Sequence, residues 1–283
     1  MFFKSWFVYF IFFMEIKINK SFFNLNINNV SSFLLVLLGI LIGSMVGITG
    51  ASGVLIMVPI LSSFTNLPMP IILGTSLMVD VIVSFSVTTT YASFRNVKTK
   101  GIQWILFGSF IGAQIGSLFV VAIPKVIIIL IIVIGMIGFG LRMLKDKVSS
   151  EKGSETLGKP LPMFIWGIIV GLTTGLFGAG GGIMTFLMLR YFLKFSTKKA
   201  IGTSTLIMLI TAIFGVAGYI LNSNLDFKLS LIIGVPAFIA GMIISAIANK
   251  INDNVLNRVI GMTFIISALF MLVSKIIIPL FGI

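Results

Sequence analysis

Residues 39–77 read GILIGSMVGITGASGVLIMVPILSSFTNLPMPIILGTSL, and residues 167–205 read GIIVGLTTGLFGAGGGIMTFLMLRYFLKFSTKKAIGTST. The two stretches align without a gap at a spacing of 128 residues. The shared residues of the first are Gly39, Gly43, Gly47, Gly50, Ala51, Gly53 and Gly74-Thr75-Ser76, which return as Gly167, Gly171, Gly175, Gly178, Ala179, Gly181 and Gly202-Thr203-Ser204. Self-similarity at a fixed spacing indicates an internally duplicated chain.

The composition indicates the class of protein. Hydrophobic residues make up 58% of the 283 residues and charged residues only 10%, whereas soluble domains carry about 25% charged residues. Several apolar runs reach the ~20 residues that a helix needs to cross a bilayer. We therefore expect an all-α, polytopic protein of the plasma membrane.

Charge and residue usage exclude several kinds of chemistry. The chain has no Cys and no His, which excludes disulfides, thiol chemistry and His-held metals, and we expect neither a metal nor a cofactor. The net charge of +13 indicates no nucleic-acid partner in such an apolar chain, because cations flank membrane segments on the cytoplasmic side.

The apolar runs and their polar interruptions predict four parts of the chain. Residues 1–30 form an interfacial or disordered leader, residues 31–144 a first membrane repeat, residues 145–160 a polar cytoplasmic linker, and residues 161–283 a second membrane repeat. The first repeat holds a broken segment at 32–64 and helices near 70–94, 102–122 and 125–144. The second holds a broken segment at 163–195 and helices near 199–221, 228–248 and 255–278.

Each broken segment has a glycine-rich turn in its middle, at residues 49–53 and 177–182. The segment is either a single kinked span or a re-entrant hairpin of two arms. A hairpin places the basic clusters at 142–159 and 190–199 on the same face, and a single span places them on opposite faces. The preference of Lys and Arg for the cytoplasmic side favours the hairpin. The two repeats, each a hairpin plus three transmembrane helices, are then inverted.

The turns suggest the charge of a ligand. An arm of ~14 residues reaches ~21 Å, past the middle of a ~30 Å hydrocarbon core, so the two turns would meet near the midplane. A helix N-terminus follows each turn and attracts anions, and glycines let a ligand approach the backbone. The candidate substrate-binding residues are Thr49, Gly50, Ala51, Ser52, Gly53, Gly178, Ala179, Gly180, Gly181 and Gly182. The glycines upstream of the turns are better explained by close helix packing.

Polar residues in the following helices are further candidates. Thr75, Ser76, Thr203 and Ser204 could contact a ligand, cap a helix or bond back to a carbonyl within it. Asp80, the one acidic residue within a predicted span, is costly there and suggests function. It is a candidate for carrying a coupling proton or sodium ion, and the alternatives are that it faces a polar cavity or pairs with Arg95 or a nearby hydroxyl.

Gln114 in the third predicted helix of the first repeat is a weaker candidate. A glutamine within a membrane helix also serves to hydrogen-bond neighbouring helices. The counterpart of Asp80 in the second repeat is Met208, so the acidic residue is not part of the duplicated pattern.

These motifs resemble the TauE/SafE family of sulfite exporters and organosulfur permeases. The family signature is a Gly-x-Gly-Gly-Gly turn, a nearby Pro and a downstream Gly-Thr-Ser, all occurring twice. Residues 178–182 match the turn fully and lack the Pro, while residues 50–54 carry Ser52 and Val54 in place of two glycines and keep Pro59. Phe94-Arg95-Asn96-Val97 also looks like the family pattern. The resemblance covers about residues 33–278, and Asp80 departs from the apolar residue expected there.

The resemblance implies export of sulfite or a sulfonate. Together with the residues, it predicts a secondary transporter of a small sulfur-containing or organic anion that works by alternating access. The expected partners are this anion, the lipid bilayer and a coupling proton or sodium ion, and no oligomeric state is indicated. The alternatives are a cation-coupled carrier of another solute centred on Asp80, or an anion channel. An intramembrane enzyme is disfavoured because no nucleophile has a visible base.

Overall fold

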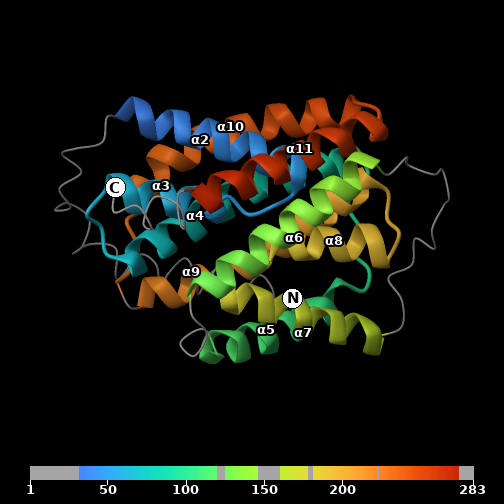
Figure 1. Ribbon diagram of the computed structural model, residues 1–283, viewed down its shortest axis with the longest axis horizontal. Helices are drawn as coiled ribbons and strands as arrows, with labels where there is room; N and C mark the ends of the chain where they lie inside the picture. The colour runs from blue at the N-terminus through green and yellow to red at the C-terminus, as the bar shows by residue number, and fades with distance from the viewer. Residues whose placement is uncertain (1–31, 120–124, 146–159, 178–180, 222, 274–283) are drawn as a thin grey trace, which may run out of the picture.

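The computed structural model describes residues 32–119, 125–145, 160–177, 181–221 and 223–273 (Figure 1). Among these residues all regular structure is helical, which confirms the all-α prediction. The helices are α2 (Ser32–Thr49), α3 (Val54–Phe64), α4 (Met69–Ser93), α5 (Ile102–Phe119), α6 (Lys125–Lys145), α7 (Pro160–Phe177), α8 (Gly182–Leu187), the π-helix η1 (Met188–Phe192), α9 (Thr197–Leu221), α10 (Phe227–Lys250) and α11 (Asp253–Leu272). The predicted leader, residues 146–159 of the linker, Gly178, Ala179 and Gly180 lie outside the described residues.

Several helices have the length and apolarity of membrane spans. Within the described residues, α2, α4, α9, α10 and α11 are long and apolar enough to cross a bilayer, and shorter apolar stretches lie in α5, α7 and the α8–η1 unit. Large apolar side chains such as Phe33 and Ile134 are exposed, while Thr49, Asp80 and Thr203 are fully buried. An apolar exterior around a polar interior is what lipid as solvent favours. The chain is a polytopic membrane protein.

The sequence duplication reappears in the helices. Shifting the bounds of α2, α3 and α4 by 128 residues reproduces the bounds of α7, of α8 with η1, and of α9. The same shift relates α5 to α10 and α6 to α11, with ends that differ by a few residues. The arms of the broken segment are unequal, because α2 has 18 residues and α3 has 11. At 1.5 Å per residue they measure ~27 Å and ~16 Å, rather than the equal lengths that the sequence suggests.

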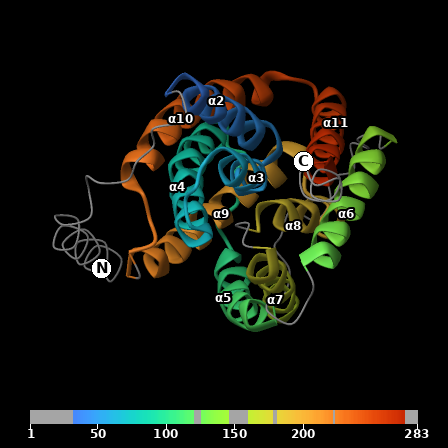
Figure 2. The same cartoon turned by 60° about the vertical axis from the view of Figure 1, so that its left-hand side comes forward.

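The strongest helix contacts cross between the repeats. Helix α2 packs on α10, α7 packs on α5, α4 on α9 and α6 on α11 (Figure 2). A Cβ atom at Gly43 would overlap the carbonyl oxygen of Ala237 in α10, and one at Gly171 would overlap that of Ser109 in α5. Backbones this close exclude any side chain. The prediction that the upstream glycines permit close packing is therefore confirmed at these positions.

The contacts also give the direction of each helix. Gly39 and Gly43 of α2 face Ile233 and Ala237 of α10, so α2 runs parallel to α10. Helix α4 also runs parallel to α10, because Ile82 lies at Gly234 and Val87 lies at Gly241. Since α2 and α4 run the same way, α3 between them runs back (Figure 1).

The second repeat runs in the opposite direction. Gly74 near the start of α4 meets Asn224 beyond the end of α9, and Gly202 near the start of α9 meets Asn96 beyond the end of α4. Helices α4 and α9 are therefore antiparallel. Figure 1 shows α2 beginning at the left of the view and α7 at the right.

Basic residues gather where α4, α6, η1 and α10 end and where α5, α9 and α11 begin. We call this end of the bundle the basic face, and its described cations are Arg95, Lys98, Lys100, Arg142, Lys145, Arg190, Lys194, Lys198, Lys199, Lys250 and Arg258. The opposite face has Lys125 and Lys228 among the described residues. By the preference of Lys and Arg for the cytoplasmic side, the basic face is predicted to be cytoplasmic.

Candidate functional site

The turn of the first repeat is a buried, hydrogen-bonded loop between α2 and α3. Gly50 has φ of +65° and its N–H donates to the carbonyl of Val46 at 2.9 Å. The Thr49 hydroxyl accepts from the N–H of Ala51 at 3.0 Å and donates to the carbonyl of Met45 at 2.8 Å. Positive φ is the conformation that glycine adopts without strain, so Gly50 is the residue at which α2 stops.

The two glycine-rich turns meet inside the bundle. A Cβ atom at Gly182 would lie 2.7 Å from the oxygen of Gly50 and 3.0 Å from the nitrogen of Ser52. Gly181, like Gly50, has a positive φ of 67°. Only glycine at position 182 lets the turns approach this closely. Of the predicted second turn, Gly178, Ala179 and Gly180 lie outside the described residues.

Asp80 in α4 lies against the turn of the first repeat. Its carboxylate accepts a hydrogen bond from the N–H of Gly53 at 2.9 Å and another from the hydroxyl of Ser52. The Ser52 hydroxyl in turn accepts from the N–H of Val54 at 3.2 Å. The carboxylate thus caps the N-terminal end of α3, and the side chain of Asp80 is fully buried.

The second repeat has no such carboxylate. The residue that corresponds to Asp80 is Met208, and its sulfur would lie 2.9 Å from a Cβ atom at Gly182. The described parts of the two turns thus differ in charge, because only the first has an acidic partner among the described residues. They also differ in backbone, because Gly53 has φ of −70° and its counterpart Gly181 has φ of 67°.

The Gly-Thr-Ser triplets hold the connectors between helices. The Thr75 hydroxyl accepts from the N–H of Asp226, and the Thr203 hydroxyl accepts from the N–H of Lys98, both at 3.1 Å. These pairs are related by the same shift of 128 residues. The start of α4 thus hydrogen-bonds to the connector between α9 and α10, and the start of α9 to the connector between α4 and α5. We call these two hydrogen bonds the reciprocal clamp.

The serines of the triplets bond back within their own helices. Ser76 donates to the carbonyl of Ile72 at 2.7 Å, and Ser204 donates to that of Ile201 at 2.9 Å. Ser204 is also 3.5 Å from the carbonyl oxygen of Gly50. Among the four hydroxyls of the triplets, Ser204 is thus the one with a contact to the turn.

Of the residues that shape the two connectors held by the clamp, Tyr91, Tyr219 and Asn224 were not singled out from the sequence. The N–H of Asn96 donates to the carbonyl of Tyr91, and that of Asn224 donates to the carbonyl of Tyr219, both at 2.9 Å. The asparagine backbones shape the two connectors that Thr203 and Thr75 hold. The signal was present in the sequence, because both Tyr and Asn recur at the same shift beyond the aligned stretch.

Gln114 differs from the turn residues in its surroundings. It lies on α5 and is exposed, whereas Thr49, Ser52 and Asp80 are buried. Among the described residues, no cluster of three acidic side chains could hold a metal ion.

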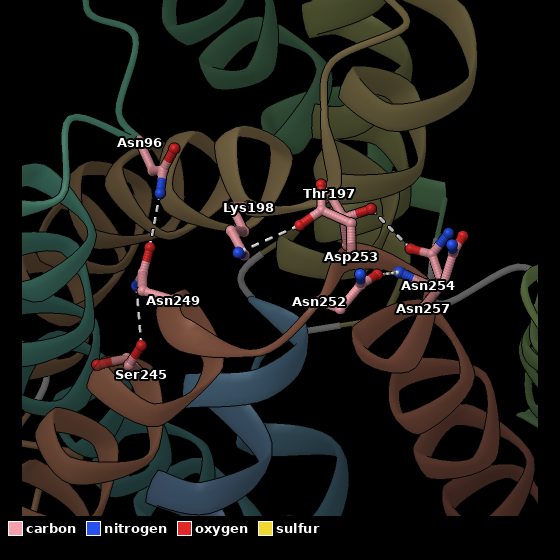
Figure 3. A network of polar contacts seen from close by, with 9 residues as sticks. All are labelled: Asn96, Thr197, Lys198, Ser245, Asn249, Asn252, Asp253, Asn254 and Asn257. Carbon is pink, nitrogen blue, oxygen red and sulfur yellow. Dashed lines mark hydrogen bonds and ion pairs between the residues drawn. The ribbon is translucent and has the colours of Figure 1, made fainter. Parts of the chain in front are cut away.

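A polar network links helix ends at the basic face (Figure 3). Asn96 donates to the side chain of Asn249 at 2.6 Å, and Thr197 donates to Asn257 at 2.6 Å. Lys198 and Asp253 form an ion pair at 3.3 Å. The residues that correspond to this ion pair are Pro70 and Lys125, so the opposite face has no equivalent pair.

The fold and site define a class of protein. Two repeated sets of helices enclose two meeting glycine-rich turns, in a bundle with an apolar exterior, which is the architecture of a multi-pass membrane protein with an internal repeat. Residues 35–271 match the family described as Sulfite exporter TauE/SafE. The chain belongs to this family.

The chain matches curated relatives over nearly the whole length of those relatives. The chain is 25% identical over 243 residues to the probable membrane transporter protein YdhB of Bacillus subtilis (strain 168), covering 84% of this chain and 99% of that protein. It is 26% identical over 258 residues to the probable membrane transporter protein MJ0441 of Methanocaldococcus jannaschii, covering 84% and 94%. No solved structure matches. The family and these names indicate a membrane transporter rather than an enzyme.

Proposed function

We propose that the protein is a secondary transporter of the plasma membrane that exports a small sulfur-containing or organic anion such as sulfite or a sulfonate. The observation that supports this most is the meeting of the two turns inside the bundle, with Gly182 against the backbone of Gly50 and Ser52. Backbone N–H groups at a glycine-rich turn can bind an anion without a buried Arg or Lys.

The transport step is alternating access around the turns. The anion is held by the backbone of residues 49–53 and 178–182 near the midplane, and the two repeats change their packing to open one face at a time. Ser204 is the triplet hydroxyl best placed to contact the anion, since it is the one with a contact to Gly50. Thr75 and Thr203 keep the connectors in place.

Asp80 is the proposed coupling residue. A proton taken up by the carboxyl, or a sodium ion held by it, would link the anion to an ion gradient. Because Asp80 contacts the same turn, a cation-coupled carrier of another solute remains the second candidate, with Asp80 as the cation ligand. An anion channel is the third.

The test is thermal unfolding of the purified protein in sulfite, sulfate, thiosulfate, sulfoacetate, taurine and simple carboxylates. A ligand at a hundredfold excess over its Kd stabilises the folded state by ~2.7 kcal/mol. We expect a sulfur oxyanion or sulfonate to raise the melting temperature and taurine, a zwitterion, to do less.

Flux into proteoliposomes separates a carrier from a channel. We expect saturable uptake of the stabilising anion and counterflow from the opposite side. Gly138→Ala should transport like the wild type, because nothing lies within 4 Å of the added methyl. Uptake that does not saturate and shows no counterflow would establish a channel instead.

A further inference from the structure

We propose that Asp80 is a built-in anion that occupies the first-repeat half of the site and gives way to the transported anion only when it is protonated. The inference rests on the proposed function and adds the manner of coupling. It makes uptake of the anion and uptake of a proton by Asp80 a single event.

The contacts of Asp80 are those that an anionic ligand would make. The N–H of Gly53 points at one carboxylate oxygen at 2.9 Å, and the Ser52 hydroxyl donates to the other. An N–H and a hydroxyl at the start of the 11-residue helix α3 form the kind of place where carboxylates, sulfates and phosphates bind. A carboxylate oxygen and a sulfonate oxygen are equivalent acceptors here. The chain therefore fills this half of its own site.

No cation balances Asp80 among the described residues around it. The helices that pack on α4 are α2, α3, α9 and α10. The first two carry no charged residue, and the charged residues of the others lie at their ends, as Lys198, Lys199, Lys228 and Lys250. The carboxylate is held by the positive end of α3 and by the Ser52 hydroxyl. A second anion beside it would be repelled strongly in so apolar a setting.

The second repeat lacks a carboxylate at the position that corresponds to Asp80. Met208 stands where a second carboxylate would be, so the turn at Gly181 and Gly182 has no built-in anion among the described residues. When Asp80 gains a proton and a monovalent anion enters, the site carries the same single negative charge before and after. Binding of the anion and protonation of Asp80 therefore favour each other, so the two binding events are thermodynamically coupled.

Chemical rescue tests the built-in anion independently of the substrate. Asp80→Ala removes the carboxylate and leaves the Gly53 N–H and the Ser52 hydroxyl without their acceptor. Asp80→Asn keeps an oxygen there and serves as the control. We expect sodium formate to raise the melting temperature of Asp80→Ala in a saturable way, with little effect on Asp80→Asn and none from sodium chloride at equal concentration. Equal shifts of the melting temperature by formate in the wild type, Asp80→Ala and Asp80→Asn would overturn the proposal.

Proton uptake tests the exchange. Isethionate is a monovalent sulfonate that does not titrate near neutral pH, and its binding is measured calorimetrically in buffers of different ionisation enthalpy. We expect wild-type protein to take up about one proton per anion bound. The Kd for isethionate should rise by up to about tenfold per pH unit at pH values where free Asp80 is ionised. Asp80→Asn should bind at least as tightly, with no proton uptake and no pH dependence.

The outcomes separate the inference from the function on which it rests. Unchanged proton uptake in Asp80→Asn would overturn the exchange even if isethionate binds well. If isethionate binds neither protein, the proposed substrate class is wrong, and the formate measurement still decides whether Asp80 is a built-in anion. If Asp80→Ala does not fold, the comparison of wild type with Asp80→Asn decides the exchange.

Discussion

Glycines at the turns are required for different physical reasons. Gly50 and Gly181 have positive φ, where other residues cost about 1–2 kcal/mol. Gly53 has φ of −70°, which any residue adopts. Its constraint is space, because an added Cβ atom would overlap the side chain of Ile42 and lie 3.2 Å from a carboxylate oxygen of Asp80. Glycines of the same motif are therefore required for different reasons: backbone conformation at Gly50 and Gly181, and space at Gly53.

A double-mutant cycle separates space from strain at Gly53. Gly53→Ala should lower the free energy of unfolding by about 1–3 kcal/mol through overpacking against Ile42. Ile42→Ala removes the clashing methyl, so the double variant should lose less stability than the sum of the single variants. Denaturant unfolding in detergent measures all three, and a strictly additive loss would show that Ile42 does not limit this position.

The elements interlock across the duplication. Helices α2 and α7 each bury a face of glycines against a helix of the opposite repeat, and the reciprocal clamp joins the start of α4 to the α9–α10 connector and the start of α9 to the α4–α5 connector. Helix α3 and its counterpart, α8 with η1, are irregular at the same place. Pro59 lies inside α3. Its counterpart is Leu187, and the π-helix η1 begins at the next residue, Met188. Neither repeat buries its own apolar and glycine-rich surfaces alone, so the repeats depend on each other for stability.

Substitutions at Thr203 test the clamp against ligand binding. Thr203→Val keeps the volume and leaves the Lys98 N–H without its acceptor, which should cost about 1–3 kcal/mol of stability. Thr203→Ser keeps the hydroxyl and should retain most of the stability. We expect anion affinity, measured by calorimetry on the folded fraction, to be unchanged in both. Loss of affinity without loss of stability would instead place Thr203 in the anion site.

At the scale of the whole molecule, the two repeated sets of helices differ in their charged residues. The helix bounds follow the duplication closely, but Asp80 has Met208 as its counterpart, and the ion pair Lys198–Asp253 has Pro70 and Lys125. The faces of the bundle are therefore different, and only the basic face has this link among the described residues. Such asymmetry lets the two open states of a transporter differ in energy.

Cysteine labelling in cells tests the arrangement of the repeats. The chain has no native Cys, and Lys100, Lys228 and Lys250 are all exposed. Hairpin-forming broken segments place positions 100 and 250 on the cytoplasmic side and position 228 outside. An impermeant maleimide should therefore label Lys228→Cys in intact cells, and the other two only after the membrane is opened. Labelling of positions 100 and 250 from opposite sides would indicate single kinked spans.

Much of the fold follows from local patterns in the chain. Apolar run length, the recurrence of glycines at a fixed shift and the placement of Lys and Arg predict the membrane class, the duplicated helices and the close-packed glycine faces. These properties depend on residues near one another in sequence, or on the same residues recurring, so they are visible without coordinates.

Only the tertiary structure decided the partners of the polar side chains. Asp80 lies 27 residues after Gly53, and no periodicity indicates that its carboxylate caps α3 rather than pairing with Arg95. Thr75 and Thr203 resemble ligand groups in the sequence, yet each accepts from a connector more than 100 residues away in the chain. Such hydrogen bonds depend on which helix faces pack together, and packing between repeats brings distant residues within reach without leaving a mark in the local sequence.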